Sequence, residues 1–172
     1  MASCAVESTI DVAFWFLDRA RAEDSYLQAQ KLQRLLYLAQ GLYAQENYGR
    51  KLMPATFVTH DMGPLEPNVY RIFEAGRPAI AYVPPAAEVQ DFLERVWRRF
   101  AIHPVERLNA FVTAQSAYAK AAVRGLGEEI PHDALSEAFT TPEQKKAPTL
   151  RTPDGRRVRK WLPSRTAPKG RR

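Results

Sequence analysis

The stretch from Ser25 to Tyr43 constrains the fold most, because its apolar residues recur three and four positions apart. That spacing places them on one side of a helix. These residues are Leu32, Leu35, Leu36, Ala39, Leu42 and Tyr43. Leu38 widens the apolar face, so we expect this helix to lie at the centre of the fold.

The polar residues of this stretch predict how the helix begins. Ser25 followed by Gln28 favours a capping box, in which each side chain satisfies a free backbone N–H of the first turn. The remaining polar side chains fall mostly off the apolar face. They are Lys31, Gln33, Arg34 and Gln40.

Helical spacing recurs along the chain as far as residue 139. It predicts helices over 8–22, where Ser8 and Asp11 form a capping pair, over 88–101 and from Pro104 to Val123. Shorter helices are expected from Pro67 and at a cap on Asp133. Residues 54–59 and 80–83 are short runs with strand character that could pair with each other. The predicted fold class is mainly α: a compact multi-helix domain with a small two-stranded sheet, followed by a basic C-terminal arm.

Charge divides the chain into two parts. Residues 140–172 hold 11 Lys and Arg against 2 Asp and Glu, a net charge of +9, whereas residues 1–139 hold 14 against 17, a net charge of −3. We therefore predict a helical domain over 1–139 and a basic, proline-rich tail over 140–172. Inside the tail, Pro153-Asp154-Gly155 is a turn signal between 149–152 and 156–162, which indicates a β-hairpin or an extended arm.

A basic tail commonly meets nucleic acid or an acidic protein face, although a solvated tail has the same composition. Trp161 stands among arginines that include Arg157 and Arg159. Such an aromatic residue can stack on a base, anchor in a partner's pocket or fold back onto the body of its own chain. The sequence leaves these three alternatives open.

Several classes of protein are disfavoured. No apolar run approaches the length of a membrane span, and the N-terminus lacks the pattern of a secretory signal. Cys4 is the single cysteine, so no internal disulfide can form, which suits a reducing compartment. We expect a cytoplasmic protein without a membrane partner.

The chain also lacks the patterns of an enzyme. His60, His103 and His132 are too far apart in sequence for a typical metal motif, and no serine or cysteine stands in a nucleophile motif. In His60-Asp61, adjacent side chains on an extended segment point to opposite faces, so Asp61 is better explained by the turn at Gly63-Pro64. We predict no catalytic residue, no metal and no cofactor.

The order of motifs resembles the SocA-like, or Panacea, antitoxin domain. The resemblance rests on 11–17, on the helix 30–41 with its Lys-Leu-Gln-Arg-Leu-Leu-Tyr sequence, on the Gly63-Pro64-Leu65 turn and on Pro67-Asn68-Val69-Tyr70. That family has a Lys-Leu-Gln-Lys-Leu-Leu-Tyr-like helix, a Gly-Pro-Val turn and then a tyrosine-containing helix. This chain carries Arg34 where lysine is usual and Leu65 where valine is usual, and residues 111–118 lack the late His and Trp of many members.

The resemblance implies a non-enzymatic antitoxin that binds a protein toxin encoded beside it. In the SocA type, the antitoxin is an adaptor that brings the toxin to the ClpXP protease, so ClpX is an implied second partner. We assign candidate toxin contacts to the helical body and a candidate second contact to the tail. The body residues are Lys31, Arg34, Tyr37, His60 and Tyr70, and the tail residues are Arg157, Arg159 and Trp161. The alternative is a DNA-associated or autoregulating antitoxin that binds nucleic acid through its tail.

Overall fold

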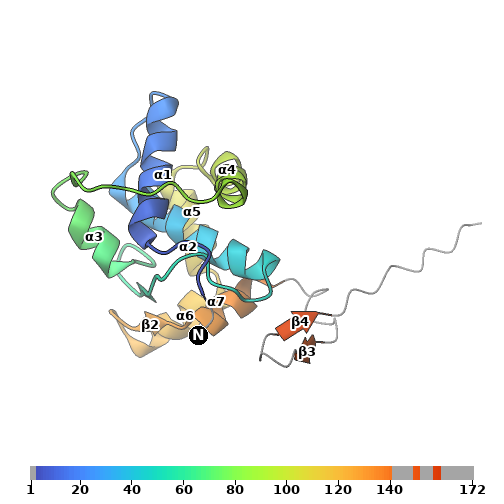
Figure 1. Cartoon of the computed structure of the whole chain (residues 1–172). Coiled ribbons are helices and arrows are strands. Elements are labelled where there is room, and N and C mark those ends of the chain that lie inside the picture. The colour runs from blue at the N-terminus through green and yellow to red at the C-terminus, as the bar shows by residue number, and fades with distance from the viewer. Residues whose placement is uncertain (1–2, 141–148, 152–156, 160–172) are drawn as a thin grey trace, which may run out of the picture. The chain divides into compact units, whose positions relative to one another are not determined.

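The computed structural model describes residues 3–140, 149–151 and 157–159, and the chain divides into two compact units, Met1–Thr140 and Thr141–Arg172. Helices are the main secondary structure of the first unit (Figure 1). They are α1 (Thr9–Ala22), α2 (Ala29–Glu46), α3 (Pro67–Phe73), α4 (Ala87–Phe100), α5 (Val105–Thr113), α6 (Ser116–Arg124) and α7 (His132–Phe139). The mainly α fold class predicted from the sequence is confirmed.

Helix α2 is the centre of the first unit, as its apolar spacing predicts. It packs against α1, α3, α4, α5 and α7, and every residue from 32 to 41 is buried. The predicted capping box is wrong, since α2 begins at Ala29 and the Gln28 side chain caps nothing. Residues 23–28 are instead used to turn the chain between α1 and α2. The Ser25 hydroxyl donates to the carbonyl of Ala20 at 3.0 Å and closes the end of α1.

The small sheet joins segments that are far apart in sequence. Strand β1 (Phe57–Val58) pairs antiparallel with β2 (Glu129–Ile130), with Phe57 opposite Ile130. The predicted pairing of 57–59 with 80–83 is therefore wrong. Residues 80–83 form no strand, and the backbone N–H of Val83 donates to the carboxylate of Asp11 on α1 at 3.2 Å.

Helix bounds or helix caps differ from the expected ones at three further places. The helix expected from Pro104 to Val123 breaks at Ala114–Gln115, and the break lets Val112 on α5 and Ala117 on α6 both be buried. At the start of α7, the capping position is taken by Pro131, and Asp133 lies in the first turn, where a carboxylate favours the helix dipole. At α1, Ser8 accepts from the N–H of Ile10 as a cap, but Asp11 is engaged by Val83.

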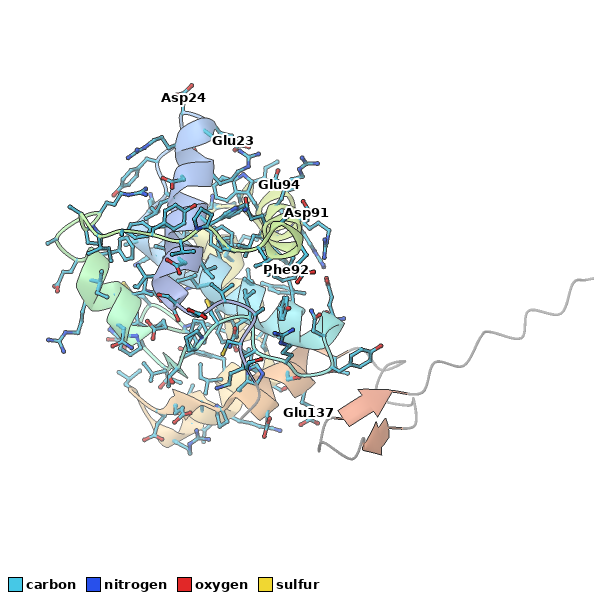
Figure 2. All side chains as sticks on the ribbon, in the orientation of Figure 1. Glu23, Asp24, Asp91, Phe92, Glu94 and Glu137 are labelled. Atoms are coloured by element: carbon cyan, nitrogen blue, oxygen red, sulfur yellow. The ribbon has the colours of Figure 1, made fainter. Side chains whose placement is uncertain are left out.

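An ion-pair cluster joins the end of α1 to α4. Figure 2 labels its two carboxylates, Glu23 at the end of α1 and Glu94 on α4. The Arg19 guanidinium donates to Glu94 at 2.7 Å and also pairs with Glu23 at 2.8 Å. Its hydrogen bond to Glu94 lowers the pKa of that carboxyl group. The indole N–H of Trp97 donates to Glu23 at 3.2 Å. Because Trp97 is a buried core residue, this hydrogen bond connects the ion-pair cluster to the hydrophobic core.

The second unit contains two short antiparallel strands, β3 (Thr149–Arg151) and β4 (Arg157–Arg159), with Leu150 opposite Val158. They lie where the turn signal indicates a hairpin. Among the helices that the structure describes, none is long and apolar enough to cross a membrane.

Candidate partner-binding site

Five of the predicted contact residues lie on α2 or on the segment that follows β1. This segment, residues 59–70, is fixed to α2 by buried polar side chains. Gln33 holds the backbone of Glu66 at two points: its Oε1 accepts from the Glu66 N–H at 2.8 Å, and its Nε2 donates to the Glu66 carbonyl at 3.4 Å. We call this two-point contact a bracket. Gln40 forms a second bracket, on the N–H and the carbonyl of Met53, at 3.2 and 3.0 Å.

The carboxylate of Glu66 caps helix α3. One of its oxygens accepts from the backbone N–H of Val69 at 2.6 Å, and the other accepts from the side-chain amide of Asn68 at 3.2 Å. The residue is 1% exposed. Because its backbone is held by Gln33 and its side chain by α3, the start of α3 is fixed relative to α2.

Arg34 clamps three segments together beneath the surface. The residue is 1% exposed, and its guanidinium donates to the side-chain oxygen of Asn109 on α5 and to the carbonyl of Pro64. Gly63 lies against the guanidinium with φ +97°, and a Cβ there would come within 2.9 Å of Nη2. Across the part of the chain that the structure describes, Arg34 has no carboxylate partner. Burial therefore lowers the pKa of Arg34 to about 10.

Tyr37 is a core residue. Its ring packs edge-on against Phe57 and Phe139, with centroids 5.3 and 6.2 Å away. Within the described residues its hydroxyl has no hydrogen-bond partner, and burial raises the pKa of that hydroxyl. Because Arg34 and Tyr37 are buried, a partner cannot contact them directly, and they contribute to the site by positioning the residues around them.

His60 and Tyr70, near the two ends of the segment 59–70, lie against each other. Their ring centroids are 6.4 Å apart, and Tyr70 is 37% exposed. The position of His60 is fixed twice: its Nδ1 accepts from the N–H of Met62 at 3.2 Å, and its carbonyl accepts from the Tyr118 hydroxyl at 3.0 Å. Tyr70 is thus exposed and His60 half-buried, so this ring pair is a part of the predicted set that a partner can touch directly.

Lys31 lies apart from these rings, near the start of α2. Its ammonium group donates to the carbonyl of Ala101, at the end of α4. It borders a surface hollow of about 240 Å³, whose lining residues are Tyr26, Gln28, Lys31, Pro104, Val105 and Glu106. In the second unit, Arg157 and Arg159 belong to β4, and Trp161 lies outside the described residues.

Sequence reasoning missed the residues that position the site. Gln33, Gln40 and Glu66 are buried polar residues, and although the two glutamines lie within the 30–41 motif, none of the three was assigned to the site. One signal was present in the sequence: a glutamate directly before Pro67 occupies the position from which a side chain caps a helix. No local pattern points to the two glutamines, because the backbone groups that they bind are 13 and 33 residues away.

His132, a half-buried histidine, predicts how the stability of the fold depends on pH. The Nε2 of His132 lies 2.9 Å from the carbonyl of Gly49, its Nδ1 is buried without a partner in the described region, and burial lowers its pKa. The unfolded chain then binds a proton before the folded chain does. We therefore expect the free energy of unfolding to fall as the pH drops below about 6.5, the ordinary histidine pKa.

Urea unfolding of the wild type and of His132→Gln, followed between about pH 7.5 and pH 5.5, measures this dependence. The substitution should flatten the slope, and His103→Gln is the matched control. An equal slope in wild type and His132→Gln would contradict the assignment to His132.

Comparison with known proteins gives one informative match. No family model matches the chain, so its assignment to the Panacea domain stays a prediction, and no solved structure matches it. The chain is 40% identical over 67 residues to antitoxin SocA from Caulobacter vibrioides (strain NA1000 / CB15N). The match covers 39% of this chain and 35% of that protein, so it spans about a third of the relative's length. Over that stretch, the chain is similar to a SocA antitoxin, which supports the resemblance inferred from its motifs.

Proposed function

We propose that this chain is an antitoxin that acts by binding a protein toxin and not by catalysis. The sequence match to antitoxin SocA carries the proposal. The fold is compatible with a binding role, since the buried Gln33 bracket and the Glu66 helix cap hold the segment 59–70 in place without a partner. Pre-organisation of this kind reduces the conformational entropy that association must overcome.

The proposed toxin-binding surface is centred on His60 and Tyr70. Tyrosine is enriched among interface residues that dominate binding energy, because it offers a large rigid ring and a polar hydroxyl. Arg34 supports this surface from beneath through Pro64. Its role there is to position the turn.

We further propose that the chain is an adaptor for the ClpXP protease. An adaptor needs one surface for its cargo and another for the unfoldase, so that the cargo is held at high local concentration near the protease. The basic tail with Arg157, Arg159 and Trp161 is the candidate second surface. A simple masking antitoxin would need the first surface alone, which makes the two mechanisms separable by experiment.

Co-purification tests the toxin-binding proposal. The tagged chain is expressed together with the product of the neighbouring reading frame, and a stoichiometric complex is expected. Tyr70→Ala should weaken this complex by about 10-fold or more, in the range of an interface hot spot. Tyr48→Ala is the matched control, since Tyr48 is 60% exposed and follows the C-terminal end of α2. The absence of any complex with the wild type would overturn the toxin-binding proposal.

Degradation of the purified toxin by ClpXP then tests the adaptor mechanism. Full-length chain should accelerate the loss of toxin, and a chain truncated after residue 139 should bind the toxin without accelerating its loss. If the toxin is protected equally by both chains, masking replaces the adaptor proposal.

Charge favours a second candidate function. The net charge of +9 in residues 140–172 suits the backbone of nucleic acid. An autoregulating antitoxin would bind DNA with an affinity that falls steeply as salt is added, and this binding would be lost on removal of the tail. Salt-insensitive binding, or none, would exclude this candidate.

A further inference from the structure

The segment between α3 and α4 covers one face of α1. We call residues 74–86 the strap. Figure 1 shows it crossing α1 without forming a helix or strand. From residue 77 to 85, Val83 is the one residue whose backbone N–H donates a hydrogen bond within the described chain, and its acceptor is a side chain, Asp11. The strap is therefore held by side-chain contacts and not by backbone pairing.

The α1 side of these contacts is a regular stripe. Asp11, Phe14 and Asp18 are spaced by three and four positions, so they share one face of the helix. The result is an aromatic ring between two carboxylates, which we call the α1 stripe. Phe14 is 1% exposed because the strap lies over it together with Phe73 of α3.

Two strap residues match this stripe in chemistry. The Arg77 guanidinium makes two hydrogen bonds to the Asp18 carboxylate, at 2.5 and 3.2 Å, and lies 4.5 Å above the centre of the Phe14 ring. The Tyr82 ring meets Phe14 edge-on, with centroids 5.5 Å apart. A cation placed over an aromatic face and beside a carboxylate is attracted by both.

Within the described chain, displacing the strap would break one hydrogen bond donated by the backbone of residues 77–85, that of the Val83 N–H to Asp11. The Arg77 and Asp18 side chains are 34% and 39% exposed, so water and salt compete for their ion pair. Two apolar strap residues, Ile80 and Val83, already point largely to solvent at 53% and 70% exposure. A segment from another protein that carries a guanidinium group and an aromatic ring could make the contacts that Arg77 and Tyr82 make with the α1 stripe.

We propose that the α1 stripe is a binding site for a partner segment that carries a basic residue and an aromatic residue. The strap occupies this site as an internal ligand, and the partner segment displaces it. The carboxylates and the face of the Phe14 ring attract the basic residue, and the Phe14 ring provides an edge-on contact for the aromatic residue. This inference goes beyond the proposed toxin contacts, because it concerns residues of α1 and not His60 and Tyr70, and its occupant is a protein segment with one basic and one aromatic residue.

A peptide with the sequence of residues 76–84 is the probe. It is titrated into ¹⁵N-labelled full-length chain that carries Arg77→Ala and Tyr82→Ala, so that the internal ligand is weakened. We expect chemical-shift changes centred on 11–18, with at least about 10-fold tighter apparent binding than in the wild type, whose tethered strap competes at millimolar effective concentration. Asp18→Asn in the same background should abolish most of this binding.

Controls separate recognition from nonspecific contact. A peptide with alanine in place of its arginine and tyrosine should leave 11–18 unshifted, and Arg124→Ala, which removes a partly exposed arginine from α6, should behave as the wild type. If the double variant loses its helical circular dichroism, Arg77→Ala alone is used and a smaller gain is expected. A folded variant that shows no shifts at 11–18, or equal shifts with the alanine peptide, would overturn the proposal.

Discussion

Replacing Gln33 with leucine is expected to lower the free energy of unfolding by about 2–4 kcal/mol. Leucine keeps most of the side-chain volume but has no polar atom. The N–H and the carbonyl of Glu66 would then be left without the partners that they have in the buried bracket. Each unsatisfied buried group costs about 1–3 kcal/mol, and the leucine recovers part of this through apolar burial.

Urea unfolding followed by circular dichroism measures this loss. Gln28→Leu is the matched control, because Gln28 is exposed and its side chain caps nothing, and it should stay within about 0.5 kcal/mol of the wild type. We also expect Gln33→Leu to weaken any complex formed through Tyr70, since the bracket fixes the start of α3. Stability equal to that of the control would show that the bracket is energetically neutral.

Replacing Gly41 with alanine is expected to destabilise the protein by about 1–3 kcal/mol, although alanine is the better helix former by about 1 kcal/mol. The reason is the packing of α2 against α7. A Cβ at this position would lie 2.5 Å from the ring of Phe139, which is itself 9% exposed and has little room to move. Overpacking at the most extensive helix contact in the fold therefore outweighs helix propensity.

A double-mutant cycle tests this explanation. In a Phe139→Ala background the clash is gone, so Gly41→Ala should become neutral or stabilising there, and the sign of its effect should reverse. Thermal and urea unfolding of the four chains provide the measurement. If Gly41→Ala stabilises the chain that retains Phe139, the packing at this helix crossing is looser than described.

The sequence predicted the elements of the fold better than their contacts. The spacing of Leu32, Leu35 and Leu36 is a property of a single helix, so the central position of α2 could be inferred from it. The hydrogen-bond partners of Gln33, Arg34 and Gln40 could not be inferred in this way, because these side chains bind backbone groups from distant segments of the chain. The strand pairing of Phe57 with Ile130 joins residues more than seventy positions apart, and no local pattern encodes it.

The candidate site was predictable to a similar degree. The motif comparison selected a segment in which the rings of His60 and Tyr70 lie against each other and Tyr70 is exposed, but its role in binding a partner stays a prediction. Arg34 and Tyr37 belong to the same motif but are buried, so their contribution is to shape the site. Helix spacing cannot distinguish these cases when the polar face of a helix is also covered, as it is for α2.

The two glutamine brackets also bear on the order of folding events. A bracket can close only after α2 has formed and the loop backbone at Met53 or Glu66 has reached it. We therefore expect both brackets to be absent from the folding transition state, so that substitutions at Gln33 and Gln40 leave the folding rate nearly unchanged and accelerate unfolding. The lifetime of the folded chain, and with it resistance to proteolysis through global unfolding, then depends on two neutral side chains.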